Sequence, residues 1–63
     1  MTVKELLDVF DKIEVITFFY DGGIETIDAN AEGSFKAIKK YFDSNVLRTT
    51  AVGHHEIRIV VKN

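Results

Sequence analysis

The 63-residue chain contains no cysteine and only two histidines, His54 and His55. The absence of cysteine excludes disulfide bonds and thiolate metal sites, which very small domains often use for stability. Two histidines are too few for a histidine metal cage. A domain of this length buries only about 60% of the surface that its unfolded chain exposes. We therefore expect marginal stability that comes from ordinary packing or from a partner.

Long apolar runs are also missing. No segment approaches the roughly 18 residues of a membrane span, and Met1 leads into an acidic amphipathic segment instead of a signal peptide. The hydrophobic fraction of 46% and the charged fraction of 29% are typical of a soluble globular protein. Together with the lack of cysteine, these features favour a cytoplasmic, reducing compartment. Since there is no linker, repeat or low-complexity run, we interpret residues 1–63 as one domain.

The charges are sorted along the chain. Residues 1–32 contain eight acidic side chains and two lysines, whereas residues 33–63 contain six basic and two acidic side chains. The formal net charge of −2 therefore conceals a dipolar molecule. Such a separation of charge can orient an encounter with a charged partner, but it does not identify that partner.

A first helix is predicted from Thr2 to about Asp11. Thr2 and Glu5 have the spacing of a capping box, in which each residue satisfies a backbone or side-chain group of the other. Apolar residues recur at positions i, i+3, i+4 and i+7, which is the pattern of a helix with one buried face. These residues are Val3, Leu6, Leu7 and Phe10.

A second helix is predicted in the middle of the chain. Asn30 or Ser34 is a suitable cap, and the helix is expected to run to about Phe42 or Asp43. Its apolar stripe comprises Phe35, Ile38 and Phe42, with the lysines largely off that stripe.

Two hairpins complete the pattern. The first joins the β-branched and aromatic run 13–20 to the run 24–29 through Asp21, Gly22 and Gly23, because glycine supplies the positive φ of tight turns. Its loop length stays open. The second hairpin is predicted to have a three-residue loop, 53–55, because a slip by one residue would turn every side chain to the wrong face. The expected pairs are Val52 with Glu56, Ala51 with Ile57, Thr49 with Ile59 and Leu47 with Val61.

These elements predict an α+β fold of order αββαββ, in which a four-stranded antiparallel sheet of two hairpins packs with two helices, most simply on one face. Alternate residues of a strand point to opposite faces, so Phe18 and Tyr20 share one face and Phe19 lies on the other. Both faces are apolar. One of them is expected to form an interface, with a homodimer or a second protein as its partner. The alternatives are helices on both faces, or shielding by lysine and arginine stems.

Signs of chemistry are weak. Ser34 and Ser44, the only serines, lack a nucleophile-elbow context. Asp21 would repel phosphate from the adjacent glycines, which lie between two strands instead of before a helix. The two histidines fall on a predicted turn and need not converge on one ion. We therefore expect a protein that is not an enzyme and that binds neither a cofactor nor a metal ion.

Two charged sets remain as candidate interfaces. Acidic residues of the first hairpin could occupy a basic groove while the hairpin aromatics supply contact energy. This predicted partner-binding set is Phe18, Phe19, Tyr20, Asp21, Glu25 and Asp28. The alternative is a basic nucleic-acid surface, although the chain is acidic with a pI near 5.5. That set is Lys36, Lys39, Lys40, Arg48 and Arg58. Ordinary solvated charges would explain either set.

Three segments carry a resemblance. They read Met1-Thr-Val-Lys-Glu-Leu-Leu-Asp8, Tyr41-Phe-Asp-Ser-Asn-Val-Leu47 and Ile57-Arg-Ile-Val-Val61. In these segments the chain resembles small accessory proteins of phages and prophages of Gram-positive bacteria, some of which are anti-CRISPR proteins. The resemblance implies a compact, non-enzymatic binder in the bacterial cytoplasm and assigns no residue a role.

The expected function is therefore a protein-binding module that inhibits or modulates a host protein such as a CRISPR-associated nuclease. A direct nucleic-acid-binding protein is one alternative. A small structural or self-assembling phage component, for which a homodimer is a natural form, is the other.

Overall fold

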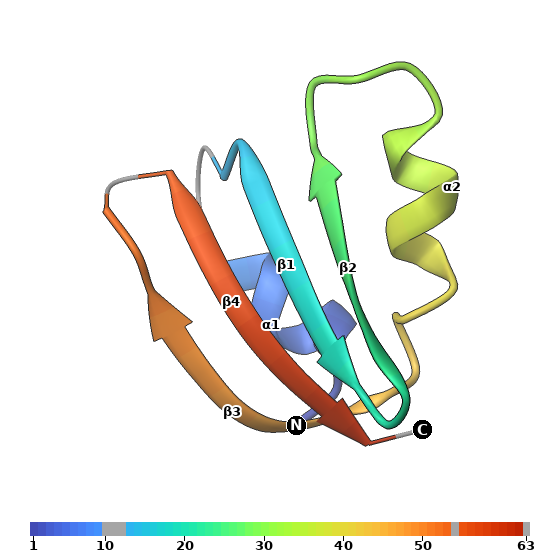
Figure 1. Ribbon diagram of the computed structural model, residues 1–63, viewed down its shortest axis with the longest axis vertical. Helices are drawn as coiled ribbons and strands as arrows, with labels where there is room; N and C mark the ends of the chain where they lie inside the picture. The colour runs from blue at the N-terminus through green and yellow to red at the C-terminus, as the bar shows by residue number, and fades with distance from the viewer. Residues whose placement is uncertain (10–12, 54, 63) are drawn as a thin grey trace.

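The computed structural model describes residues 1–9, 13–53 and 55–62. It is an α+β fold with two helices and a four-stranded sheet, which confirms the predicted class (Figure 1). Along the chain the elements are α1 (Val3–Val9), β1 (Val15–Tyr20), β2 (Gly23–Asp28), α2 (Ser34–Lys39), β3 (Asn45–Ala51) and β4 (Glu56–Lys62).

The sheet is mixed, so the predicted all-antiparallel sheet is wrong. The strand order is β2-β1-β4-β3, and the two central strands, β1 and β4, run parallel. Each hairpin is antiparallel, as its own turn requires. The segment from β2 through α2 carries the chain from one edge of the sheet to the other edge at β3 (Figure 1). The return along β4 then lies beside β1 and parallel to it.

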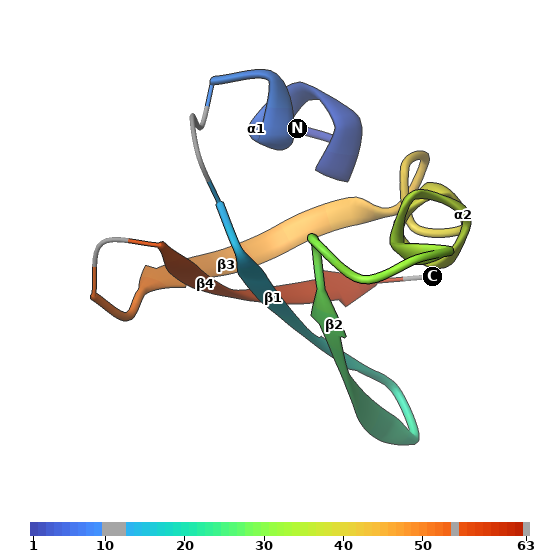
Figure 2. The same ribbon diagram turned by 90° about the horizontal axis from the view of Figure 1, so that it is seen from above.

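Both helices lie on the same side of the sheet (Figure 2). The core forms between the helices and that face: Ile16 of β1 pairs with Ile27 of β2 and Ile57 of β4, and Phe18 pairs with Ile59. Strand alternation places all of these side chains on one face. The buried core residues are Val3, Leu6, Ile16, Phe18, Ile27, Ile38, Tyr41, Ile57, Ile59 and Val61.

Helix α1 begins as its capping box predicts. The backbone N–H of Thr2 donates to Glu5 Oε1 at 2.9 Å, and the backbone N–H of Glu5 donates to Thr2 Oγ1 at 3.3 Å. Val3 and Leu6 are buried and Leu7 is half-buried, whereas predicted Phe10 lies outside the described residues. Residues 1–3 also pair with the start of β3, where the N–H of Val46 donates to the Met1 carbonyl at 2.8 Å.

Helix α2 differs from its prediction at both ends. Its N-cap is Gly33, with φ 82° and no side-chain cap, while the Ser34 hydroxyl donates to the Ala29 carbonyl at 2.8 Å. After Lys39 the chain tightens into i to i−3 turns, with the N–H of Tyr41 donating to Ile38. Since residues three apart nearly eclipse in such a turn, Tyr41 joins Ile38 in the core. Phe35 is instead 67% exposed, so its predicted place in the buried stripe is wrong.

The first hairpin settles its loop length, whereas the predicted loop 53–55 of the second includes His54, which lies outside the described residues. In the first, Asp21 and Gly22 form a two-residue turn with Gly22 at φ 102°, and Tyr20 pairs with Gly23. The ring of Tyr20 lies so close to Gly23 that an added Cβ would meet its hydroxyl oxygen at 3.0 Å.

The second hairpin follows the predicted register from its loop to the middle of the strands. Ala51 pairs with Ile57 and Thr49 with Ile59, and the N–H of Val52 donates to the Glu56 carbonyl. A β-bulge between residues 46 and 48 then shifts the register, so Val46 pairs with Val61. The predicted pairing of Leu47 with Val61 is wrong for that reason. Leu47 is released from the core and is exposed.

Candidate protein-interaction face

The face of the sheet opposite the helices carries no covering layer in the part of the chain that is described (Figure 2). We call it the open face. The strand register assigns its members row by row across the four strands. They are Val15, Thr17 and Phe19 of β1, Ile24, Thr26 and Asp28 of β2, Asn45, Arg48 and Thr50 of β3, and Glu56, Arg58, Val60 and Lys62 of β4.

An apolar row crosses the open face. Phe19 pairs with Ile24 on one side and with Val60 on the other, so three apolar side chains lie level on adjacent strands. Leu47, freed by the bulge, lines a shallow hollow of about 590 Å³ together with Phe19 and Val60. Ile24 and Leu47 are 63% and 61% exposed. We call these four residues the apolar row, and it is the part of this face that gains most from contact with another apolar surface.

A polar row runs beside it. Thr26, Thr17, Arg58 and Thr50 lie level across the sheet. The hydroxyls of Thr17 and Thr26 are 3.3 Å apart and hydrogen-bonded, and Thr17 is only 8% exposed. Cross-strand threonine pairs of this kind stabilise a sheet without adding apolar surface. The polar row therefore limits the apolar patch to a narrow band.

The charge asymmetry of the sequence reappears on the open face. The β1–β2 hairpin contributes Asp28, with Asp21 at its turn, while the β3–β4 hairpin contributes Arg48, Arg58 and Lys62 along with Glu56. Asp21 and Lys62 line the same hollow as Phe19. One half of the face is thus acidic, the other half is mainly basic, and the face as a whole carries three acidic and three basic side chains.

The predicted partner-binding residues are divided between the two faces. Phe19 and Asp28 belong to the open face, and Asp21 is exposed at its end. Phe18 is 0% exposed, with its ring stacked on Tyr41 at 4.0 Å, so its side chain cannot reach a partner in this structure. Tyr20 is half-buried on the side of the helices.

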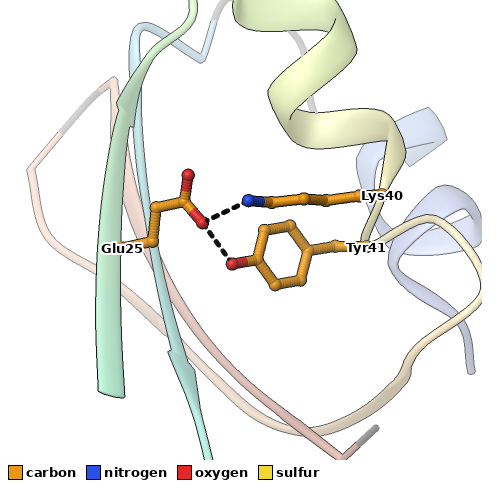
Figure 3. Close-up of polar contacts among 3 residues, drawn as sticks. All are labelled: Glu25, Lys40 and Tyr41. Atoms are coloured by element: carbon orange, nitrogen blue, oxygen red, sulfur yellow. Dashed lines mark hydrogen bonds and ion pairs between the residues drawn. The ribbon is translucent and has the colours of Figure 1, made fainter.

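Glu25 also lies on the side of the helices, where two residues at the end of α2 hold it (Figure 3). Its Oε1 accepts a hydrogen bond from the Tyr41 hydroxyl and lies 2.9 Å from Lys40 Nζ. The hydrogen bond from Tyr41, followed by that from Lys40, lowers the pKa of Glu25. Burial, reinforced by the same carboxylate, raises the pKa of Tyr41. An ionised carboxylate thus accepts from a neutral phenol, an arrangement that fastens α2 to β2 and leaves Glu25 engaged within the fold.

The candidate nucleic-acid residues do not share one surface. Arg48 and Arg58 lie on the open face, whereas Lys36 and Lys39 belong to α2, on the opposite side of the sheet. Lys40 follows that helix and pairs with Glu25. The predicted continuous basic surface is therefore wrong in its geometry, because the sheet separates its two parts.

No group of three or more potential metal ligands comes together among the described residues. His55 contributes its backbone carbonyl, which accepts from the N–H groups of Glu14 and Val15 at 2.8 and 3.1 Å. His54 lies outside the described residues. Within the ranges that the structure covers, neither helix is long and apolar enough to cross a membrane.

The apolar row was only partly foreseen. Phe19 was among the predicted contacts, but Ile24, Leu47 and Val60 were not. Val60 carries a signal in the sequence, because it is apolar where its alternate neighbours Arg58 and Lys62 are charged. Leu47 carries none, since the bulge that exposes it depends on pairing between strands.

Comparisons with protein families, with curated proteins and with solved structures found no match to this chain.

Proposed function

We propose that this protein is a small, non-enzymatic protein-binding module that inhibits or modulates a host protein, and that it contacts its partner through the open face. The observation that supports this proposal is the apolar row, which lies on the face of the sheet that the described residues leave without a covering layer. Interfaces commonly place such apolar residues at the centre and charged residues at the rim. The open face has the apolar row and, at its edges, the charged residues Asp21, Asp28 and Lys62.

The resemblance to phage accessory proteins makes a CRISPR-associated nuclease in the bacterial cytoplasm the most concrete target. Because Glu25 is bound by Tyr41 and Lys40 within the fold, we assign the proposed contact to Phe19 and its neighbours instead of the whole acidic hairpin. Asp21 and Asp28 then act at the rim, where a charge affects the rate of association and its salt dependence more than the final affinity.

The test uses two matched variants. Phe19→Thr removes the central aromatic and continues the threonine pattern of the open face, whereas Phe35→Gln removes an equally large, exposed aromatic from α2 on the other side. Wild-type protein and Phe35→Gln should capture the same protein from a bacterial host lysate, and Phe19→Thr should not. The captured protein, once purified, should bind the wild type directly with at least tenfold higher affinity than Phe19→Thr, as expected for a central aromatic contact.

Two results would contradict the proposal. One is equal capture by wild type and Phe19→Thr, which would remove the open face from the interaction. The other is retention of DNA or RNA by micromolar wild-type protein at low salt, which would favour nucleic-acid binding instead. A cleavage assay with purified CRISPR-associated nucleases identifies the target class directly, because an inhibitor should reduce cleavage and Phe19→Thr should restore it.

A further inference from the structure

The open face is charged in opposite senses on its two halves, and a two-fold rotation converts such a pattern into complementarity. We propose that the open face of one copy packs on the open face of a second copy, about a two-fold axis parallel to the strands. The acidic β1–β2 hairpin of each copy then covers the largely basic β3–β4 hairpin of the other. In the absence of another partner, the open face is therefore covered by a second copy of the same chain.

The register makes the match specific. A two-fold axis along the strands reverses the strand order and keeps each row level, as in aligned sheet packing. Phe19 therefore lies over the partner's Val60, and Ile24 lies over the partner's Arg48, next to its bulge residue Leu47. Each contact occurs twice, because a two-fold interface uses the same patch on both subunits. The contacts of Phe19 with Val60 thus form the apolar part of the interface, with Ile24 and Leu47 beside them.

Charge favours this arrangement over the other way in which two open faces can pack about a two-fold axis, with the axis across the strands. With the axis along the strands, Asp21 lies over the partner's Lys62, again twice. Neither Asp21 nor Lys62 forms an ion pair within its own copy in the described part of the chain. With the axis across the strands, the rows would be inverted, so Asp21 would cover an apolar valine and Phe19 would cover a threonine. The inverted rows therefore lose both the contact of Asp21 with Lys62 and that of Phe19 with Val60, which the axis along the strands provides.

The balance of charge permits the contact. Although the whole chain carries a formal net charge of −2, the open face holds three acidic and three basic side chains. Two copies therefore meet without net repulsion at the interface.

The size of the face sets the expected strength. Four strands spaced about 4.8 Å apart, each about 20 Å long, give a flat area on the order of 400 Å² per copy. The pair then buries about 800 Å², below the range of about 1,200–2,000 Å² that is typical of stable specific complexes. We therefore expect a reversible dimer whose dissociation constant is micromolar or higher. Because it uses the same face, the dimer should compete with the host protein, and this consequence alone rests on the proposed function.

Sedimentation of the full chain from micromolar to millimolar concentration tests the dimer. Wild type and Phe35→Gln should show the same concentration-dependent dimer, and Phe19→Thr should weaken it at least tenfold. Asp21→Lys and Lys62→Glu should each weaken self-association, because each gives its interface like charges. Mixed in equal amounts, the two variants should associate as tightly as wild type, since two positive side chains of one copy then face two negative side chains of the other.

Circular dichroism spectra identical to wild type should accompany each variant, so that weaker association is not a failure to fold. A wild type that remains monomeric at millimolar concentration would overturn the dimer, and charge variants that do not associate on mixing would overturn its register. Loss of the dimer with Phe19-dependent capture retained would leave the proposed function standing. A dimer without any Phe19-dependent capture would contradict the proposed function and support the dimer.

Discussion

The two faces of β1 are nearly equal in apolar character and have different fates. Ile16 and Phe18 point toward the helices and are buried, whereas Phe19, one residue further on, lies on the face opposite α1 and α2. The described residues form two short helices, and both lie in one layer. The comparison shows that a small domain can bury one apolar face of a strand under its helices while the opposite face stays outside that core.

Phe18→Ala should produce the largest effect, because it tests the covered face at its centre. Loss of the ring removes its stacking on Tyr41 and leaves a cavity, at a cost of about 3–5 kcal/mol in the free energy of unfolding. A domain of this length is expected to have about 3–9 kcal/mol in total. Urea denaturation followed by circular dichroism should show the variant largely unfolded at low urea. An unchanged midpoint would mean that Phe18 is not the centre of the core.

Tyr41→Phe should have a moderate effect, because it keeps the ring on Phe18 and removes only the hydroxyl that donates to Glu25. We expect a loss of about 1 kcal/mol, the usual contribution of one such hydrogen bond. Tyr20→Phe is the matched control, since the Tyr20 hydroxyl forms no hydrogen bond among the described residues. Equal midpoints for the two variants would contradict a structural role for the Glu25 contact.

The same contact predicts a difference in pH dependence. The pKa of Glu25 is lower in the folded protein than its usual value. The stability that its ionised carboxylate contributes is therefore fully present at a pH above the usual pKa, and it is lost as the pH falls through the pKa of the folded state. Wild type should therefore lose stability between about pH 5 and pH 3, and Tyr41→Phe should lose less. Glu5, whose pKa is lowered by hydrogen bonds from Thr2, contributes with the same sign in both proteins. Parallel stability curves would contradict this assignment.

Phe19→Thr should have the smallest effect on folding, because it tests the open face. The residue is half-buried and its replacement suits a strand, so the free energy of unfolding of the monomer should change by less than about 1 kcal/mol. Urea denaturation at low protein concentration measures this without the contribution of a dimer. A loss as large as that of Phe18→Ala would mean that the open face belongs to the core.

Sequence reasoning succeeded where the signal was local. The capping box of Thr2 and Glu5 forms, the first hairpin turns at Asp21 and Gly22, and the second hairpin begins in the expected register. Each of these features depends on residues within a few positions of one another. It failed at Phe35, which is exposed, and at Tyr41, which a tightened turn after Lys39 brings into the core and which the helical periodicity does not indicate.

The same reasoning predicted part of the candidate site. Strand alternation separates Phe18 from Phe19 in advance, but it does not say which one the helices cover. Glu25 was expected to be an exposed acid because its partners, Lys40 and Tyr41, lie about fifteen residues away on the far side of a loop. Contacts at that separation depend on how α2 packs against β2.

By itself, the sequence determined the elements, their order and the apolar character of both sides of β1, because caps, turns and periodicity act over a few residues. Only the tertiary structure decided that β1 and β4 run parallel, that both helices share one face, and that Phe19 lies on the other. The physical reason is that either face of β1 could have been buried at similar gain. One of these two faces is covered because the chain crosses over through α2, where Tyr41 stacks on Phe18 and donates a hydrogen bond to Glu25.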